Sequence, residues 1–280
     1  MKNYAALLGE WLTEDPFYEK IFQGIRHHRL KASLSSKGSG CLAGIPFAQR
    51  AAEILGLEAV WRKNSGMAME EGEEIAQFVG MPQQIVKIEN LVIGLISKPS
   101  GIATAAQKAQ KAAGGKIRLV SGGWKKHPFL IKELIWEAVA AGGVAHRIVD
   151  EPFIYLDKNY VRIFGGISHA LKAASASSSS FLKVIQLRGE FSPIAEEALE
   201  AIASGAHVLM VDTGSPKDLN EVLKVLRKKK TSAQVRLAFA GGIQLKDIPQ
   251  LAKKGVDILD IGAAILDAPW LDLTYDVVPA

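Results

Sequence analysis

Strand-like and helix-like stretches alternate along the second half of the chain. Short apolar runs suited to buried strands are each followed by apolar residues at helical spacing. The expected pairs are 116–120 with 128–141, 161–164 with 167–174, 183–188 with 193–203, 207–212 with 217–228, and 235–240 with 245–254, with further strands at 144–149 and 257–261. Repeated units of this kind predict parallel strands covered by helices, and roughly six or seven of them fit an incomplete (β/α) barrel.

The first half of the chain has a different pattern. Residues 1–30 are predicted to be helical, with Tyr4, Leu7, Leu8 and Trp11 at helical spacing. Residues 33–40 are polar and rich in Gly and Ser, which predicts a loop, and the alternation over residues 57–62 predicts a strand. A small α+β unit is therefore expected here. A long helical stretch follows over 83–113, which Pro99 is expected to kink or interrupt because proline donates no backbone hydrogen bond.

Composition narrows the protein class. Of 280 residues, 48% are hydrophobic and 22% charged, which is typical of a soluble globular protein and excludes a disordered chain. No apolar run is long enough to span a membrane, and the N-terminus has no signal-peptide pattern. The single cysteine, Cys41, cannot form an internal disulfide, so we expect a reducing, cytoplasmic location and a buried side chain.

The charge balance indicates the kind of partner. A formal net charge of +5 suits an anionic small molecule. The only basic run, Arg227–Lys230, ends a helical pattern and has no interleaved aromatic residues. We therefore expect it to face solvent and expect no nucleic-acid binding.

Glycine-rich turns follow the last two predicted barrel strands. Gly241-Gly242 comes directly after residues 235–240, and Gly262-Ala263 comes directly after residues 257–261. Functional groups of parallel barrels gather at the carboxyl ends of the strands, and small residues there let a phosphate approach backbone N–H groups. We predict phosphate binding by these turns; the alternative is that the glycines only allow tight packing.

Charged residues follow two other predicted strands. Asp212 ends an apolar run, where a carboxylate can hold Mg²⁺ or a ribose hydroxyl; as a helix cap, Ser215 is better placed. His146-Arg147 follows Gly142-Gly143-Val144 on the second predicted strand, and a guanidinium at a strand end can clamp a carboxylate or phosphate. The alternatives there are an Arg147 ion pair with Asp150 or Glu151 and a histidine bonded to a backbone carbonyl.

A third group follows the first predicted strand. Trp124, Lys125 and Lys126 come after a Ser-Gly-Gly turn, and two ammonium groups beside such a turn suit a diphosphate or a carboxylate. The alternative is a solvated loop before the next helix. No zinc-ligand spacing and no Walker-type phosphate loop is present in the sequence.

Several segments together resemble the quinolinate phosphoribosyltransferase family, the carboxylating nicotinate-nucleotide pyrophosphorylases. The resemblance covers about residues 38 to 277. The segments that carry it, in order, are Gly40-Cys41-Leu42-Ala43-Gly44-Ile45-Pro46, Glu89-Asn90-Leu91, Ser100-Gly101-Ile102-Ala103-Thr104, Gly142-Gly143 with His146-Arg147, Met210-Val211-Asp212, Ala240-Gly241-Gly242-Ile243, and Ala268-Pro269-Trp270-Leu271-Asp272-Leu273.

The resemblance implies a fold and a reaction. It implies an α/β class with an N-terminal α/β-sandwich domain (1–98, with 268–280 packing back on it) and an α/β-barrel phosphate-binding domain (99–267). It implies a homodimer with shared active sites. It also implies transfer of a phosphoribosyl group from phosphoribosyl pyrophosphate, with Mg²⁺, to an aromatic acid of the quinolinate or nicotinate type, giving a pyridine nucleotide.

The resemblance also implies roles for residues. His146 and Arg147 match a substrate-carboxylate pair, Lys98 stands where the family has an arginine reaching in from the neighbouring subunit, and Lys125 matches a catalytic lysine. Asp212 matches a ribose and Mg²⁺ carboxylate. The phosphate loops correspond to Gly241, Gly242, Gly262 and Ala263, and Lys126, Lys158 and Trp124 are further candidates for substrate contact, the last by stacking on the acid.

Departures from the family pattern keep other functions open. Trp124 replaces an arginine, Lys158 has exchanged places with the preceding aspartate, and Gln186 and Arg188 replace paired glutamates. A relative that processes a ribose phosphate or nucleotide by another reaction, and a non-catalytic dimeric binding protein, are the two alternatives.

Overall fold

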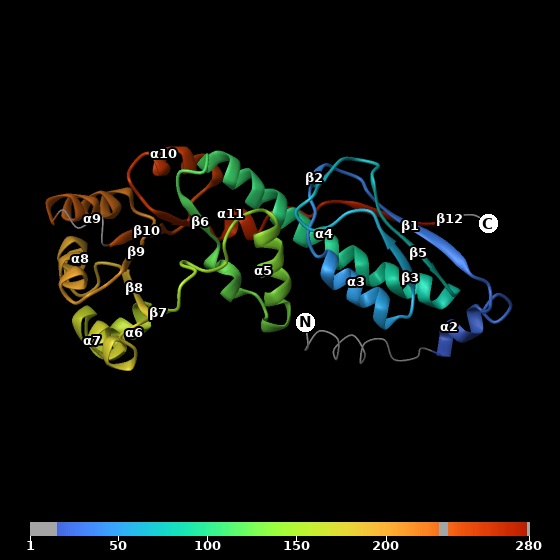
Figure 1. Cartoon of the computed structure of the whole chain (residues 1–280), viewed down its shortest axis with the longest axis horizontal. Coiled ribbons are helices and arrows are strands. Elements are labelled where there is room, and N and C mark those ends of the chain that lie inside the picture. The colour runs from blue at the N-terminus through green and yellow to red at the C-terminus, as the bar shows by residue number, and fades with distance from the viewer. Residues whose placement is uncertain (1–15, 230–234, 279–280) are drawn as a thin grey trace. The chain divides into compact units, whose positions relative to one another are not determined.

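The chain folds into two compact units (Figure 1). The computed structural model describes residues 16–229 and 235–278, so the helix expected near Tyr4–Trp11 and the last residue of the basic run lie outside the described residues. The first unit contains the residues up to Lys108, Gly123–Val144 and the residues from Ile265 onward; the second contains Ala109–Gly122 and Ala145–Ala264. The segment Gly123–Val144, which the prediction assigned to the barrel, thus groups with the first unit.

The first unit is built on a four-stranded antiparallel sheet of order β12-β1-β5-β3. Its elements are α2 (Pro16–Ile21), β1 (Leu30–Ser36), β2 (Gly40–Cys41), α3 (Ile45–Ile54), β3 (Glu58–Trp61), β4 (Ala68–Met69), β5 (Glu74–Gly80), most of α4 (Pro82–Ala113), η2 (Phe129–Ile131), α5 (Lys132–Ala141) and β12 (Leu273–Val278), with β2 and β4 as a separate pair. Strand β12 pairs with β1, so the C-terminal segment completes this sheet. Buried residues of the sheet, α3 and the first half of α4 form one core, which is an α/β sandwich.

The predicted loop at residues 33–40 is wrong for its first half, which lies in β1. Ala32, Leu34 and Ser36 point into the core, whereas Ser33 and Ser35 are half-exposed. The strand has neighbours on both sides, β12 and β5. Because serines occupy the outer face of this strand, the sequence reads as a polar loop. Pairing with two neighbouring strands stabilises the extended conformation despite this composition.

Helix α4 runs through Pro99 without a break, contrary to the expected interruption. A proline at this position leaves the carbonyl of Leu95, four residues earlier, without its helical N–H partner. Gly44 packs against this carbonyl: a Cβ added to Gly44 would lie 1.8 Å from the Leu95 oxygen. The proline and the glycine are thus two parts of one packing arrangement.

The segment from Gly40 to Pro46 is fastened to α4 by hydrogen bonds. Thr104 Oγ1 accepts the Cys41 N–H at 2.9 Å, and Ser100 Oγ accepts the Ala43 N–H at 3.0 Å. Cys41 itself is buried, as predicted. Two of the segments that carry the family resemblance therefore meet in the first unit and fix the path of the chain.

A partly buried carboxylate, that of Glu137 on α5, also contacts the segment from Gly40 to Pro46. Its Oε2 atom accepts the Gly44 N–H at 2.7 Å. Burial raises the pKa of Glu137, and hydrogen bonds from Ser65 and Gly44 only partly oppose this. Glu137 therefore takes up a proton more readily in the folded state than in the unfolded state.

We expect Glu137→Gln to raise the melting temperature at pH 7 by a few °C and to flatten its pH dependence. Because the folded pKa is raised, the stabilisation from protonated Glu137 is complete below the unfolded pKa and is lost as the pH rises through the folded pKa. The gain should shrink as the pH falls toward 4.5, in thermal melts between pH 4.5 and 8. Glu133→Gln, an exposed change on the same helix, is the control, and a loss of stability at pH 7 for Glu137→Gln alone would contradict the prediction.

The second unit is built on a six-stranded parallel sheet of order β6-β11-β10-β9-β8-β7. Its elements are β6 (Arg118–Val120), β7 (Phe153–Leu156), α6 (Lys158–Phe164), α7 (Ile167–Ser177), β8 (Leu182–Leu187), α8 (Ile194–Ala203), β9 (Val208–Asp212), α9 (Pro216–Lys229), β10 (Arg236–Ala240), η3 (Leu245–Asp247), α10 (Ile248–Ala252) and β11 (Ile258–Asp260); η1 (Gly122–Lys126) and α11 (Ala263–Leu266) are each divided between the two units. In Figure 1 the helices α6–α9 lie to the left of and below strands β7–β10. The first strand, β6, pairs with the last, β11, and the predicted α/β class with an incomplete barrel is confirmed.

Two predicted strands do not form, and the barrel opens at the first of them. Residues 144–149 contribute only one bridge, from Ala145 to Val120, and the sheet is open between Ala145 and β7. Residues 161–164 belong to helix α6, and the strand lies earlier, at Phe153–Leu156. Asp157 caps α6, because its side chain accepts the Asn159 and Tyr160 N–H groups at 2.9 and 3.3 Å. This cap, rather than the apolar run after it, marks the start of the element.

Candidate active site

The core-facing residues of three barrel strands change from apolar to polar at the carboxyl ends of the strands. Val184, Met210 and Ile258 belong to one buried cluster. Two residues later on the same three strands come Gln186, Asp212 and Asp260. Since side chains alternate along a strand, these three lie on the core-facing side. The carboxyl end of the barrel therefore carries an amide and two carboxylates.

Asp212 is held by two neighbours from β8 and the loop after it. Gln186 Nε2 donates a hydrogen bond to Asp212 Oδ2. Arg188 Nη1 donates to the Asp212 backbone carbonyl at 2.7 Å and lies 3.5 Å from Oδ2. Gln186 and Arg188 thus both contact the aspartate.

The amide of Gln186 has a fixed orientation. Its Oε1 atom accepts the Lys158 N–H, at the start of α6, at 2.6 Å. With the oxygen used in this way, Nε2 is the end that faces Asp212. Lys158 therefore contributes to the site through its backbone, in addition to any role of its ammonium group.

Arg188 belongs to a chain of ion pairs. Its Nε lies 3.3 Å from Glu190, and Glu190 also accepts two hydrogen bonds of 2.8 Å from Arg162 on α6. The hydrogen bond from Arg162 is the main reason that the pKa of Glu190 lies below its usual value. The guanidinium of Arg188 is thus flanked by two carboxylates, Glu190 and Asp212.

A buried glutamate of α8, Glu197, holds the loop that carries Arg188. Its Oε2 accepts the N–H groups of Arg188 and Gly189 at 3.0 and 2.8 Å, and its Oε1 accepts those of Glu190 and Phe191 at 2.8 and 3.2 Å. The side chain is almost fully buried. A single carboxylate therefore fixes four consecutive backbone amides. Sequence reasoning missed this residue, because a glutamate in a helix usually faces solvent.

Asp260 is a second residue that sequence reasoning missed. Its Oδ1 accepts the Gly122 N–H at 2.7 Å, and a Cβ on Gly122 would lie 2.6 Å from its other oxygen. Burial raises the pKa of Tyr155 on β7, and the charges of Asp260, Asp212 and Asp157 raise it further. Tyr155 therefore keeps its proton at neutral pH, close to these carboxylates. The available signal was the aspartate at the end of β11, two residues before Gly262.

The predicted phosphate loops differ from one another. Gly241 packs against the backbone of Gly214, since a Cβ on either would lie 2.4 Å from an atom of the other. No neighbour lies within 4 Å of the Cβ positions of Gly242 and Gly262. For Gly241 the packing explanation thus suffices, whereas Gly242, Gly262 and the exposed Ala263 leave room for a phosphate.

His146 and Arg147 lie in the segment between β6 and β7. The Arg147 guanidinium is 5.1 Å from the ring centre of Phe153, the first residue of β7, and its carbonyl accepts a bond of 3.3 Å from Arg118, the first residue of β6. Asp150 pairs with Arg118 at 2.5 Å. The Arg147 side chain thus contacts the first residue of β7, whereas His146 directly follows Ala145, which bridges Val120 at the end of β6.

His146 is neutral at pH 7. Burial lowers the pKa of its imidazole, and the neighbouring Arg147 charge lowers it further, while Asp150 opposes them. In a carboxylate-binding role, His146 would therefore act as a neutral hydrogen-bonding group and Arg147 would carry the charge.

The remaining candidates belong to the first unit. Lys98 Nζ donates to the Ala268 carbonyl of the same chain at 2.5 Å. Trp124 stacks edge-to-face on Trp136 at 5.1 Å between ring centres. Lys125 and Lys126 are exposed in the 3₁₀ turn η1.

The residues around Asp212 do not fit a directly bound Mg²⁺. Magnesium requires oxygen ligands, and here N–H donors of Gln186 and Arg188 face the carboxylate. Within residues 16–229 and 235–278, no group of three or more His, Cys, Asp or Glu is arranged to hold a metal ion. The implied magnesium site at Asp212 thus has no support from its surroundings.

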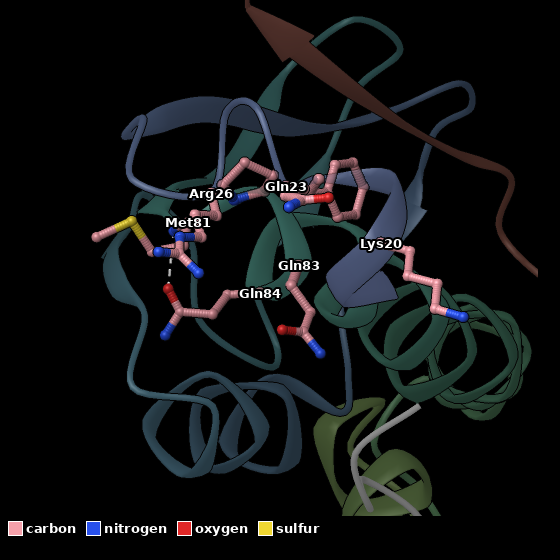
Figure 2. Close-up of a pocket in the computed structure, with 8 residues that line it drawn as sticks. Lys20, Gln23, Arg26, Met81, Gln83 and Gln84 are labelled. Carbon is pink, nitrogen blue, oxygen red and sulfur yellow. Dashed lines mark hydrogen bonds between the residues drawn. The ribbon is translucent and has the colours of Figure 1, made fainter. Parts of the chain in front are cut away.

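Two surface hollows contain none of the predicted site residues. One, of about 550 Å³, lies in the first unit between α2 with the turn after it and the start of α4 (Figure 2). Lys20 and Arg26 line it, but the Gln84 amide seen there is used within the fold, by Met81 N–H and the Leu55 carbonyl. The other, of about 700 Å³, lies in the second unit beside α9 and is lined by Lys217, Lys224, Arg227, Lys253 and Lys254, among others.

Comparisons with known proteins cover nearly the whole chain. The family model "Quinolinate phosphoribosyl transferase, N-terminal domain" matches residues 12–100, and that of the C-terminal domain matches residues 102–276. The chain is 28% identical over 275 residues to human nicotinate-nucleotide pyrophosphorylase [carboxylating], covering 96% of this chain and 90% of the relative. It is 26% identical over 250 residues to the probable Bacillus subtilis enzyme of that name, covering 88% and 83%.

Solved structures show the same fold. The nicotinate-nucleotide pyrophosphorylase of Francisella tularensis superimposes with a TM-score of 0.82 at 23% identity, covering 98% of this chain and 96% of that one. Among residues 16–229 and 235–278, no helix has the length and apolar character needed to cross a membrane.

Proposed function

The chain belongs to the quinolinate phosphoribosyltransferase family, and from this premise we propose that it transfers a phosphoribosyl group from phosphoribosyl pyrophosphate to an aromatic acid of the quinolinate or nicotinate type, giving a pyridine nucleotide. The observation that carries the proposal is the match of both domain models, in order, over residues 12–100 and 102–276. The carboxylates and open glycine turns at the end of the barrel support it.

In this reaction the bond between ribose C1 and the diphosphate oxygen breaks, and the electron pair leaves with the diphosphate. The ring nitrogen of the acid then forms the new bond to C1. The ribose carries positive charge in the transition state, which Asp212 would stabilise while it holds the ribose hydroxyls. Gly242, Gly262 and Ala263 would bind the 5′-phosphate through backbone N–H groups. Stabilisation of charge and alignment of the reactants supply the catalysis.

Other residues have roles carried over from the family. Lys125, Lys126 and Lys98 would neutralise the departing diphosphate, and Lys158 would bind substrate. His146 and Arg147 would orient the carboxylate of the acid, and Trp124 would stack on its ring. The contacts of Arg147 with Phe153 and of Trp124 with Trp136 give these two assignments no support, so they remain predictions.

The experiment mixes the purified protein with phosphoribosyl pyrophosphate, MgCl₂ and either quinolinate or nicotinate. We expect diphosphate release and nicotinate mononucleotide, with carbon dioxide from quinolinate only. Release with one acid identifies the acceptor. No release with either acid, together with thermal stabilisation by nicotinate mononucleotide but not by phosphoribosyl pyrophosphate, would favour another reaction on a nucleotide.

We further propose a homodimer with shared sites in the cytoplasm. Large exposed apolar side chains, Phe129 in η2 and Ile163 on α6, suit burial against a second copy. The single buried thiol of Cys41 suits a reducing compartment. Light scattering on the purified protein tests the dimer, and a monomer at micromolar concentration would exclude it.

A substitution at Gly262 tests the phosphate loops without disturbing the fold. A Cβ at this position meets nothing within 4 Å, and its φ lies outside the left-handed region. We expect Gly262→Ala to melt within about 2 °C of the wild type but to raise KM for phosphoribosyl pyrophosphate about tenfold, because the methyl group occupies the phosphate position.

Gly94→Ala is the matched control, since its Cβ also meets nothing within 4 Å. It should leave KM unchanged. Equal KM values for Gly262→Ala and wild type would remove Gly262 from the phosphate site.

A further inference from the structure

The positive charge beside Asp212 is the guanidinium of Arg188, a residue of the chain itself. Arg188 Nη1 reaches both the backbone carbonyl and the carboxylate of Asp212, and Gln186 covers the same oxygen, Oδ2. All of these contacts come from N–H groups, which donate to a carboxylate but cannot ligate a cation. A divalent cation on Oδ2 would compete with both donors.

Rotation of the Gln186 amide cannot create a ligand for a metal at low cost. Its oxygen accepts the Lys158 N–H at 2.6 Å, so a flip would set Nε2 against that N–H. The guanidinium 3.5 Å from Asp212 Oδ2 would also repel a second cation. Both neighbours therefore oppose metal binding at this carboxylate.

Arg188 is held at this place by its own backbone. Glu197 fixes the amides of residues 188–191, with the Arg188 N–H 3.0 Å from Oε2. Glu190, in the same loop, contacts Arg188 Nε. About a third of the Arg188 side chain is exposed, so an anion from solution can reach it.

We propose that Arg188 is the resident cation of this site, that Asp212 binds no divalent metal in the substrate-free protein, and that Glu197 is a positioning residue for Arg188. Arg188 faces the anionic substrate in the place where a metal would otherwise stand. Any magnesium used in the reaction then arrives with the diphosphate of the substrate. The role of Arg188 toward the substrate, this last consequence and the second test below rest on the proposed function, whereas the first test does not.

The first test measures Mn²⁺ binding to the substrate-free protein by electron paramagnetic resonance. The wild type should show no saturable site up to about 1 mM, whereas Gln186→Glu/Arg188→Glu should gain one, because three carboxylates then meet. Adding Asp212→Asn to that variant should abolish the new site. Stoichiometric Mn²⁺ binding by the wild type that Asp212→Asn removes would overturn the proposal, and this result needs no other variant to fold.

A folded double variant without a Mn²⁺ site would also contradict the proposal, since the side chains at positions 186 and 188 would then not meet Asp212. These measurements contain no substrate. An absence of transferase activity would therefore count against the proposed function and leave the assignment of Arg188 decided by the Mn²⁺ data.

The second test is a double-mutant cycle on the affinity for phosphoribosyl pyrophosphate, measured by calorimetry. Glu197→Gln leaves two of the four amides facing an N–H₂ group and should weaken binding about tenfold, whereas the exposed neighbour Glu196→Gln should not. In the Arg188→Ala background the effect of Glu197→Gln should vanish, because Glu197 acts through Arg188. An undiminished effect in that background would show that Glu197 serves only the fold.

Discussion

Replacing Asp212 by Asn should lower kcat/KM for phosphoribosyl transfer by about 10² to 10³. Asparagine keeps the size of the side chain but removes the negative charge that faces the positive ribose in the transition state. The loss should fall mainly on kcat, since the charge on the ribose develops only as the diphosphate leaves. Steady-state kinetics with varied phosphoribosyl pyrophosphate separates kcat from KM.

Asp218→Asn, on the first turn of α9, is the matched control, because it removes the same charge from a half-exposed position. It should leave kcat unchanged. A kcat for Asp212→Asn within threefold of the wild type would remove Asp212 from the chemistry and leave it as a partner of Gln186 and Arg188.

The second large effect is expected at Gly44. This residue has φ of +83°, and a Cβ there would lie 1.8 Å from the carbonyl oxygen of Leu95. Gly44→Ala therefore combines backbone strain of about 1–2 kcal/mol with a clash of about 1–3 kcal/mol. We expect the free energy of unfolding of the first unit to fall by about 2–5 kcal/mol, measured by urea titration.

Gly72→Ala separates the two contributions. Gly72 has φ of +81°, but no neighbour lies within 4 Å of its Cβ position. Its substitution should cost only the backbone strain, about 1–2 kcal/mol. Equal losses at both positions would mean that α4 shifts to admit the methyl group and that Gly44 does not hold its path at Pro99.

The alternation of strands and helices was visible in the sequence because each barrel strand is a short apolar run between turns. Prediction failed where local pattern and tertiary pairing disagree. Residues 161–164 are apolar enough for a strand, but Asp157 starts a helix before them. Residues 144–149 resemble a strand, yet among them only Ala145 forms a β-bridge with another strand.

The site was predicted unevenly for a similar reason. Asp212 and Gly262 stand next to a strand end, a position that the sequence reveals. Asp260 is important through the amide of Gly122, which is far away in the chain, and Glu197 through the amides of residues 188–191 in the loop before its helix. No sequence pattern shows such contacts, because they depend on the path that the folded loops take.

The anchoring of four amides by one carboxylate has an evolutionary consequence. The path of the loop after β8 depends on Glu197 and on backbone atoms, which every residue type possesses. Side chains at position 188 can therefore be exchanged during divergence without rebuilding the loop. A single substitution at position 188 can therefore change the charge beside Asp212 while the loop keeps its path.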